Sequence, residues 1–135
     1  MSSFKDINSN SVLIVDDEIS TRAILKARLG QKEGYDILEA ANGTEALEKI
    51  FENQPDVVIL DWKMPDLTGI EVLKELRQNE ETHDIPVIML TSKKLVSDVE
   101  EAFESGALAF IAKPLDLQQI SQKVGFYINQ KQESS

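Results

Sequence analysis

The chain has 135 residues, enough for one domain, and its 41% hydrophobic and 28% charged residues are ordinary for a globular protein. Its formal net charge of -10 argues against a sequence-independent grip on nucleic acid, which requires clustered lysine and arginine. The absence of cysteine excludes disulfides, thiolate metal sites and cysteine nucleophiles. No signal-peptide pattern is present and no apolar run approaches the roughly 20 residues of a membrane span, so we expect a cytoplasmic protein without membrane contact.

Short apolar runs alternate with amphipathic segments between two polar tails, residues 1–10 and 131–135, and we expect residues 11–130 to form one domain. In chain order the pattern predicts strand 11–17, helix 19–31, strand 35–40, helix 43–52, strand 55–61, helix 67–79, strand 85–91, helix 95–105, strand 107–113 and helix 116–130. Four of these runs are rich in valine, isoleucine and leucine, as in strands covered by helices on both faces. The run YDILEA contains the polar Asp36 and Glu39, which predicts an edge strand.

Helix starts and stops support this assignment. Pairs with capping-box spacing, or a close variant, are Asn42 with Glu45, Thr68 with Glu71, Ser97 with Glu100, and Asp116 with Gln119. Gly106 and Gly34 are expected to end helices in the left-handed conformation before the next strand. The sequence therefore predicts five consecutive strand–helix units.

Five such units predict an α/β fold of the flavodoxin-like (βα)5 type, a three-layer sandwich around a parallel sheet with right-handed crossovers. With the run YDILEA at the edge, the natural strand order is 2-1-3-4-5. In such a sheet, ligands bind at the carboxyl ends of the strands, where the strand order reverses between the first and third strands.

Chemically active residues stand at those strand ends. The first strand ends in Asp16 and Asp17, the third in Asp61, the fourth in Thr91, and the fifth in Lys113. Clustered carboxylates repel one another unless a cation lies among them, and oxygen ligands with room for water suit Mg²⁺. A carboxylate is also a competent nucleophile toward phosphorus. The set predicts a Mg²⁺-dependent phosphorylation of Asp61.

The motifs VDDE, DWKMPDLTG, MLTS and IAKP occur in an order and spacing that resembles the receiver domain of bacterial two-component response regulators, similar to the stand-alone chemotaxis type. The resemblance extends from about Ser11 to Gln130. It implies that Asp61 is the phosphoacceptor, that Asp17 binds Mg²⁺ directly, and that Asp16 contributes directly or through water. It also implies that the backbone carbonyl of Lys63 is a metal ligand.

The resemblance further implies a switch. Thr91 would bond the phosphoryl group and Lys113 would pair with it, while Phe110 would be the aromatic partner of Thr91 in the switch. Many members have tyrosine at the Phe110 position, and a simple core role for Phe110 remains an alternative. The Lys113–Pro114 peptide is expected to be cis, which proline permits.

Two departures concern lifetime and partners. Lys63 and Lys93 follow the phosphoacceptor and the threonine by two residues, where they would shield the acyl phosphate and slow autodephosphorylation, or would be solvated surface. Leu108 and Ala109 replace the acidic residues of the common salt-bridged dimer face. With Phe126 and Tyr127 they predict an apolar partner surface, on a monomer or weak homodimer.

The leading hypothesis is therefore a phosphoacceptor signalling module, not a dedicated enzyme, with a sensor histidine kinase or phosphotransfer protein as donor and an unidentified protein target. The chain is expected to be a stand-alone receiver, and the alternative is a fragment of a larger regulator or hybrid kinase. A Mg²⁺-dependent aspartyl-phosphate phosphatase is disfavoured because Lys63 stands where such enzymes need an acid. A flavin binder is disfavoured because the first loop is acidic.

Overall fold

The computed structural model describes residues 10–92 and 96–134. Its sheet has five parallel strands in the order β2-β1-β3-β4-β5, which confirms the predicted topology. The strands are β1 (Ser11–Val15), β2 (Asp36–Ala40), β3 (Val57–Asp61), β4 (Val87–Thr91) and β5 (Ala109–Ala112). Every strand of the prediction is present.

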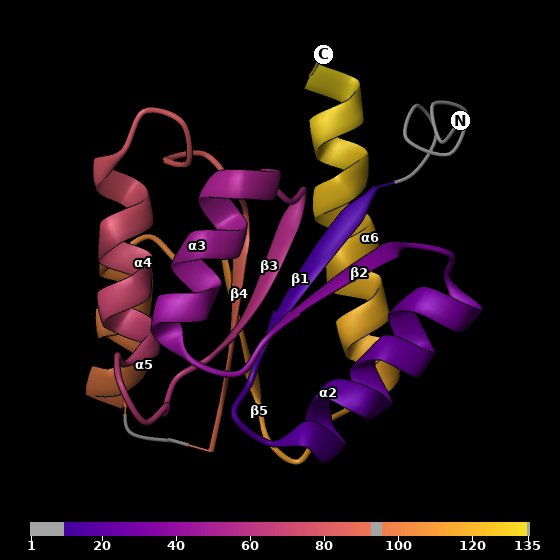
Figure 1. The fold of residues 1–135 in the computed structure, drawn as a ribbon, viewed down its shortest axis with the longest axis horizontal. Coiled ribbons are helices and arrows are strands. Elements are labelled where there is room, and N and C mark those ends of the chain that lie inside the picture. The colour runs from indigo at the N-terminus through magenta and orange to yellow at the C-terminus, as the bar shows by residue number, and fades with distance from the viewer. Residues whose placement is uncertain (1–9, 93–95, 135) are drawn as a thin grey trace.

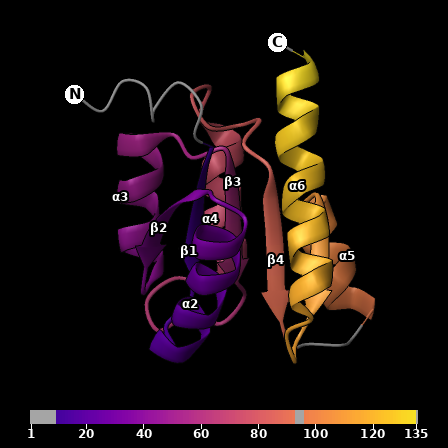
Figure 2. The ribbon, with the colours of Figure 1, turned by 90° about the vertical axis from the view of Figure 1, so that its right-hand side faces the viewer.

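Helices cover both faces of the sheet (Figures 1 and 2). They are α2 (Ile19–Lys26), its continuation η1 (Ala27–Lys32), α3 (Gly43–Asn53), α4 (Gly69–Gln78), α5 (Val96–Glu104) and α6 (Leu117–Ser134). The helices α2 and α6 lie on one face, and α3, α4 and α5 lie on the other. This arrangement confirms the three-layer sandwich.

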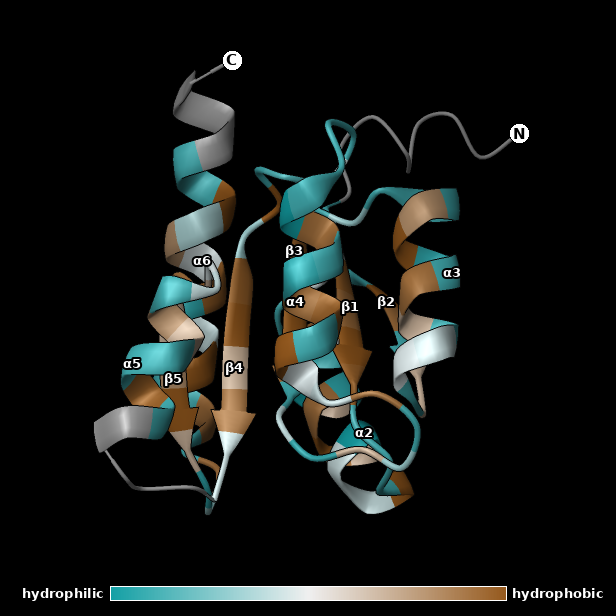
Figure 3. Ribbon diagram, turned by 90° about the vertical axis from the view of Figure 1, so that its left-hand side faces the viewer, coloured by the Kyte–Doolittle hydropathy of each residue, from teal (hydrophilic) through white to brown (hydrophobic). Residues whose placement is uncertain are grey.

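Alternation along the strands divides the core into two layers. On β1, Leu13 packs toward α3 and α4, whereas Ile14 packs toward α2 and α6. The strands β3 and β4 are buried along their whole length, while most of β2 is only partly buried, as expected of an edge strand. Figure 3 shows the consequence, with hydrophobic colour along β4 and hydrophilic colour on the outward side of α4.

Three predicted helix caps are present. The Asn42 side chain accepts from the Glu45 backbone, Thr68 and Glu71 form a complete capping box, and Asp116 accepts from the Gln119 backbone. The fourth predicted cap residue, Ser97, is the second residue of α5, and its side chain lies outside those that the structure describes. Gly34 and Gly106 have positive φ, as predicted for helix ends.

Two helices differ from the prediction. The segment predicted as helix 19–31 changes at Ala27 into a π-helix, in which the Glu33 N–H donates to the Arg28 carbonyl five residues earlier. The apolar spacing of Leu25 and Leu29 fits either helix type, so the sequence pattern does not distinguish them. The last helix, α6, continues through 131–134, four residues that were predicted to belong to a polar tail.

Candidate functional site

The carboxyl ends of the strands bring the predicted site residues together. Asp16 and Asp17 follow β1, and Asp61 is the last residue of the adjacent β3. Thr91 ends β4, and Lys113 follows β5 directly. The strand order reverses between β1 and β3, so these residues lie at the predicted ligand-binding position of the fold.

Three carboxylates form the centre of the site. Asp16, Asp17 and Asp61 each offer one oxygen, and these oxygens all lie within 4.8 Å of one another. Asp16 is fully buried and Asp61 is 5% exposed, whereas Asp17 is open to solvent. Hard oxygen donors with one solvent-facing ligand match the preference of Mg²⁺, which usually keeps several waters.

Lys113 is the positive group of the site. Its Nζ lies 3.2 Å from Asp16 Oδ2 and 3.4 Å from Asp61 Oδ1. Its backbone N–H donates to the Thr91 carbonyl at 2.8 Å, which ties the lysine to the end of β4. The Lys113–Pro114 peptide is cis, as predicted.

The charges of the site do not balance. The pKa of Asp61 is raised to about 6, first by burial and then by the neighbouring Asp16 and, more weakly, Asp17, while Lys113 opposes the shift. Burial also disfavours the charged form of Lys113, but attraction by Asp61 and Asp16 outweighs it, so the lysine pKa is raised. Among the described residues, Lys113 is the one cation in ion-pair contact with these three carboxylates, so they keep excess negative charge, which a divalent cation would neutralise.

An open pocket of about 530 Å³ lies over these groups. It is lined by Asp17, Glu18, Asp61, Lys63, Met64, Pro65, Thr91, Ser92 and Lys113. The opening lets solvent and a small donor group reach Asp61, while Thr91 is buried at the pocket wall. A pocket of this volume is large enough to admit a phosphoryl group together with its donor atom.

The segment after Asp61 is fixed more firmly than its turn-like sequence suggests. Trp62 is buried, and Gly69 packs so closely that an added Cβ would lie 2.6 Å from the Asp61 carbonyl oxygen. The Asp66 carboxylate accepts from the backbone N–H groups of Gly43 and Thr44 at the start of α3. The turn therefore joins β3 to α3 and holds the pocket wall in place.

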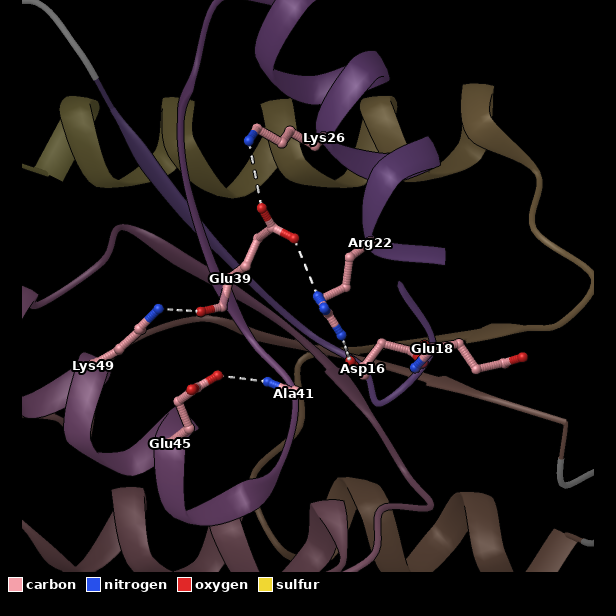
Figure 4. A network of polar contacts seen from close by, with 8 residues as sticks. All are labelled: Asp16, Glu18, Arg22, Lys26, Glu39, Ala41, Glu45 and Lys49. Carbon is pink, nitrogen blue, oxygen red and sulfur yellow. Dashed lines mark hydrogen bonds and ion pairs between the residues drawn. The ribbon is translucent and has the colours of Figure 1, made fainter. Parts of the chain in front are cut away.

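A second set of contacts holds the backbone of Asp16 in place (Figure 4). The Arg22 side chain donates to the Asp16 backbone carbonyl at 2.7 Å and to Glu39 Oε1 at 3.1 Å. Arg22, Glu39 and Asp66 were not predicted as residues of the site. Available signals were the position of Arg22 one turn into the helix that follows the acidic pair, and Glu39 as the interruption of an apolar strand.

The remaining predicted residues are placed as follows. Lys63 is exposed and borders the pocket, and Phe110 is partly buried against the core beside α3 and α4. Leu108 is exposed but Ala109 is buried, so only Leu108 of that pair can contribute to the predicted apolar surface. Lys93 lies outside the described residues.

The described helices include none with the length and apolar character needed to cross a membrane.

Comparison with known proteins agrees with this geometry. The response regulator receiver domain model matches residues 12–125. Sporulation initiation phosphotransferase F of Bacillus subtilis is 38% identical over 120 residues, which cover 89% of this chain and 94% of that protein. Transcriptional regulatory protein SrrA of Staphylococcus aureus is 39% identical over 127 residues, which cover 94% of this chain but 51% of SrrA, so this chain spans about half the length of SrrA.

Solved structures with the same architecture include two receivers. The chemotaxis protein CheY4 of Vibrio cholerae superposes with a TM-score of 0.82 at 33% identity, covering 88% of this chain and 98% of that one. A CheY-like response regulator receiver domain protein from Methanospirillum hungatei superposes with a TM-score of 0.87 at 26% identity, covering 95% and 100%.

Proposed function

This chain belongs to the response regulator receiver domain family, and on that premise we propose that it accepts a phosphoryl group on Asp61 in a Mg²⁺-dependent reaction. The observation that carries the proposal is the convergence of three carboxylates and Lys113 in one open pocket, with the pKa of Asp61 raised to about 6. A buried carboxylate held at an open site is suited to act as a nucleophile once a cation favours its ionised form.

Asp16, Asp17 and Asp61 would hold the metal, with Asp17 as a direct ligand and the Lys63 carbonyl as a backbone ligand. The solvent exposure of Asp17 and the protein partners of both Asp16 carboxylate oxygens support this division of roles. When bound, Mg²⁺ would neutralise the excess charge of the carboxylates and of the incoming phosphoryl oxygens.

The transfer itself uses Asp61. An ionised Asp61 oxygen attacks the phosphorus of a donor phosphohistidine, and the new O–P bond forms as the N–P bond breaks. The donor imidazole keeps the electron pair of that bond and takes a proton from water. Lys113, which already contacts Asp61, stays charged because its pKa is raised, and it pairs with the phosphoryl oxygens.

Phosphorylation would then act through a switch. Thr91, buried at the pocket wall, bonds the phosphoryl group, and Phe110 on the neighbouring strand responds to its movement. Hydrogen bonds to charged groups contribute roughly 1.5–3 kcal/mol each, so the Thr91 and Lys113 bonds supply much of the roughly 5.5 kcal/mol that a 1:99 to 99:1 shift requires.

The donor would be a sensor histidine kinase or a phosphotransfer protein, and the output a change in a protein-binding face. Phosphotransferase and transcriptional-regulator relatives at 38% and 39% identity support a place in a phosphorelay. In this proposal the domain is not a dedicated enzyme, because its catalysis serves its own phosphorylation and slow dephosphorylation.

The proposed slowness of dephosphorylation rests on Lys63, because its exposed side chain borders the pocket beside Asp61. A long cation there excludes attacking water from the acyl phosphate. Replacing Lys63 with Asn, alone and together with Lys93→Glu, should therefore speed decay of the phosphorylated protein. A decay rate equal to that of wild type in both variants would remove this role.

The function is tested by intact-mass spectrometry after incubation with Mg²⁺ and two donors, acetyl phosphate and a phosphorylated histidine phosphotransfer protein. Wild type and an Asp36→Asn control, altered at the opposite end of the sheet, should each gain one phosphoryl group. Asp61→Asn should gain none, and omission of Mg²⁺ should prevent the gain. Failure of wild type with both donors would overturn the proposed function.

A further inference from the structure

Asp16 is held by the protein at four different atoms. Its backbone N–H donates to the Ala40 carbonyl at 3.1 Å, and its carboxylate accepts from the Glu18 N–H at 2.9 Å and from Lys113 at 3.2 Å. Its backbone carbonyl, at the end of β1, accepts from Arg22 at 2.7 Å. The residue therefore has little freedom to move.

Asp17 is placed very differently. Within residues 10–92 and 96–134 no hydrogen-bond or ion-pair partner is assigned to its carboxylate, which is exposed. Its position therefore depends on its backbone, and the orientation of a residue is governed by the planar peptide that precedes it. That peptide, between Asp16 and Asp17, carries the carbonyl oxygen to which Arg22 donates.

Arg22 is itself held in place. Its side chain is 15% exposed, and its Nε pairs with Glu39 Oε1 while its terminal nitrogen reaches the Asp16 carbonyl. Lys26 lies 3.5 Å from the other Glu39 oxygen, and Lys49 donates to the Glu39 backbone carbonyl. Figure 4 shows these contacts linking α3, β2 and α2 to the acidic turn.

We propose that Arg22, oriented by Glu39, is a positioning residue that fixes the Asp16–Asp17 peptide and thereby sets the affinity of the site for Mg²⁺. The inference rests on the proposed function. A planar guanidinium can bond both Asp16 and Glu39 in a fixed fork, which a lysine ammonium cannot reproduce. Partners that orient metal ligands typically change metal affinity by roughly 10–100-fold when removed.

The sign of the effect separates positioning from simple electrostatics. Arg22 is a cation beside a cation-binding site, so its removal should strengthen Mg²⁺ binding if charge alone mattered. Loss of the orienting bond should weaken binding instead. The two roles therefore predict changes in opposite directions.

The experiment measures MgCl₂ binding by isothermal titration calorimetry well below the melting temperature, for wild type and four variants. Arg22→Met should raise the Mg²⁺ Kd by about ten-fold, Arg22→Lys by less, and Glu39→Gln by less than Arg22→Met. The matched control is Arg28→Met, which removes an arginine of the adjacent η1 that bonds Ser121 and Glu33. Its Kd should stay within about two-fold of wild type, because Arg28 bonds Ser121 and Glu33 and not the acidic turn.

A second readout is the Mg²⁺ dependence of phosphorylation by acetyl phosphate. The Mg²⁺ concentration for half-maximal rate should rise with the Kd in Arg22→Met, while the rate at saturating Mg²⁺ stays near that of wild type. If Arg22→Met does not fold, Arg22→Lys and Glu39→Gln carry the test. Unchanged or tighter Mg²⁺ binding in every folded Arg22 and Glu39 variant would overturn this inference alone, whereas wild type without Mg²⁺ affinity would overturn the proposed function as well.

Discussion

Two cationic side chains at opposite ends of the sheet show how differently the same kind of group is used. At the amino ends of β4 and β5, Arg77 donates twice to the Gly106 carbonyl, at 2.7 and 3.1 Å, and also to the carbonyls of Ile85 and His83 at 2.8 and 2.9 Å. At the carboxyl ends, Lys113 faces the carboxylates of Asp16 and Asp61.

The two cations differ in the charge that remains around them. Arg77 meets neutral carbonyls whose hydrogen-bonding needs it fulfils, although burial lowers its pKa and nearby Asp84 only partly opposes that shift. Lys113 meets two of three clustered carboxylates and leaves them with excess negative charge. The first end is arranged for stability, whereas the second carries an unfavourable charge that a ligand would relieve.

The largest expected effect on stability is that of replacing Arg77, at the amino ends of the strands. Arg77→Met should lower the free energy of unfolding by roughly 3 kcal/mol, because several half-buried carbonyls lose a charged donor. Chemical denaturation measures this, with Lys74→Met on the exposed side of α4 as the control. The variant should still be phosphorylated, and a loss below about 1 kcal/mol would show that the two ends do not differ as described.

At the carboxyl ends of the strands, where the site lies, a substitution should instead raise the free energy of unfolding. The pKa of Asp61 rises from 3.8 to about 6 on folding, so the ionised carboxylate destabilises the folded state. Asp61→Asn should therefore stabilise the metal-free protein at pH 7 by ~2 kcal/mol, less than the full shift implies because the open pocket admits water.

The pH dependence follows from the direction of that shift. The folded state binds the Asp61 proton more tightly than the unfolded state, so the penalty is complete above pH 6 and disappears below about pH 4. The difference between Asp61→Asn and wild type, measured with a chelator present, should close over that range. Glu75→Gln removes an exposed charge from α4 as the control. A difference that is constant with pH would contradict the charge argument.

Mg²⁺ should stabilise the folded state only through the carboxylate site at the carboxyl ends of the strands. At ten times its Kd, a ligand that binds only the folded state adds about 1.4 kcal/mol to the free energy of unfolding. Wild type and Arg77→Met should both show this increment in thermal melts at constant ionic strength, because Arg77 is remote from the site. Asp17→Asn should show little of it. An equal Mg²⁺ response in Asp17→Asn would exclude Asp17 as a direct ligand.

The fold followed from the sequence because its signals are local or periodic. The buried runs around Ile14, Ile59 and Met89 favoured central strands, and the polar interruptions at Asp36 and Glu39 indicated that β2 is an edge strand. Boundaries were harder to predict, since a polar helix end such as 131–134 has no apolar periodicity to mark it.

The site was predicted in part for a physical reason. The carboxyl ends of parallel strands lie at the same edge of a sheet, so Asp16, Asp61 and Lys113 could be grouped from the sequence alone. The residues that hold these side chains in place could not be grouped in this way. Arg22 bonds a backbone carbonyl, which has no side-chain signature, and Asp66 bonds backbone amides more than twenty residues earlier in the chain.

The smallest expected effect concerns Asp66, which lies at the same end as Asp61 but has the opposite shift. Hydrogen bonds from the Thr44 hydroxyl and from the backbone N–H groups of Thr44, Gly43 and Leu67 hold the pKa of Asp66 well below its usual range. Its contribution to stability is therefore present above the usual aspartate pKa and is lost as the pH falls toward strong acid. Asp66→Asn turns one acceptor oxygen into a donor facing other donors.

Because Asp66 is exposed, water can replace its lost bonds, and Asp66→Asn should lower the melting temperature at pH 7 by only about 1–2 °C. The deficit should shrink as wild-type Asp66 becomes protonated in strong acid, whereas the Asp61→Asn difference closes already near pH 4. Melting curves of both variants from pH 7 to pH 2 distinguish the two carboxylates. If the difference from wild type changed with pH in the same way for both variants, burial at Asp61 and amide donors at Asp66 would not account for opposite pKa shifts.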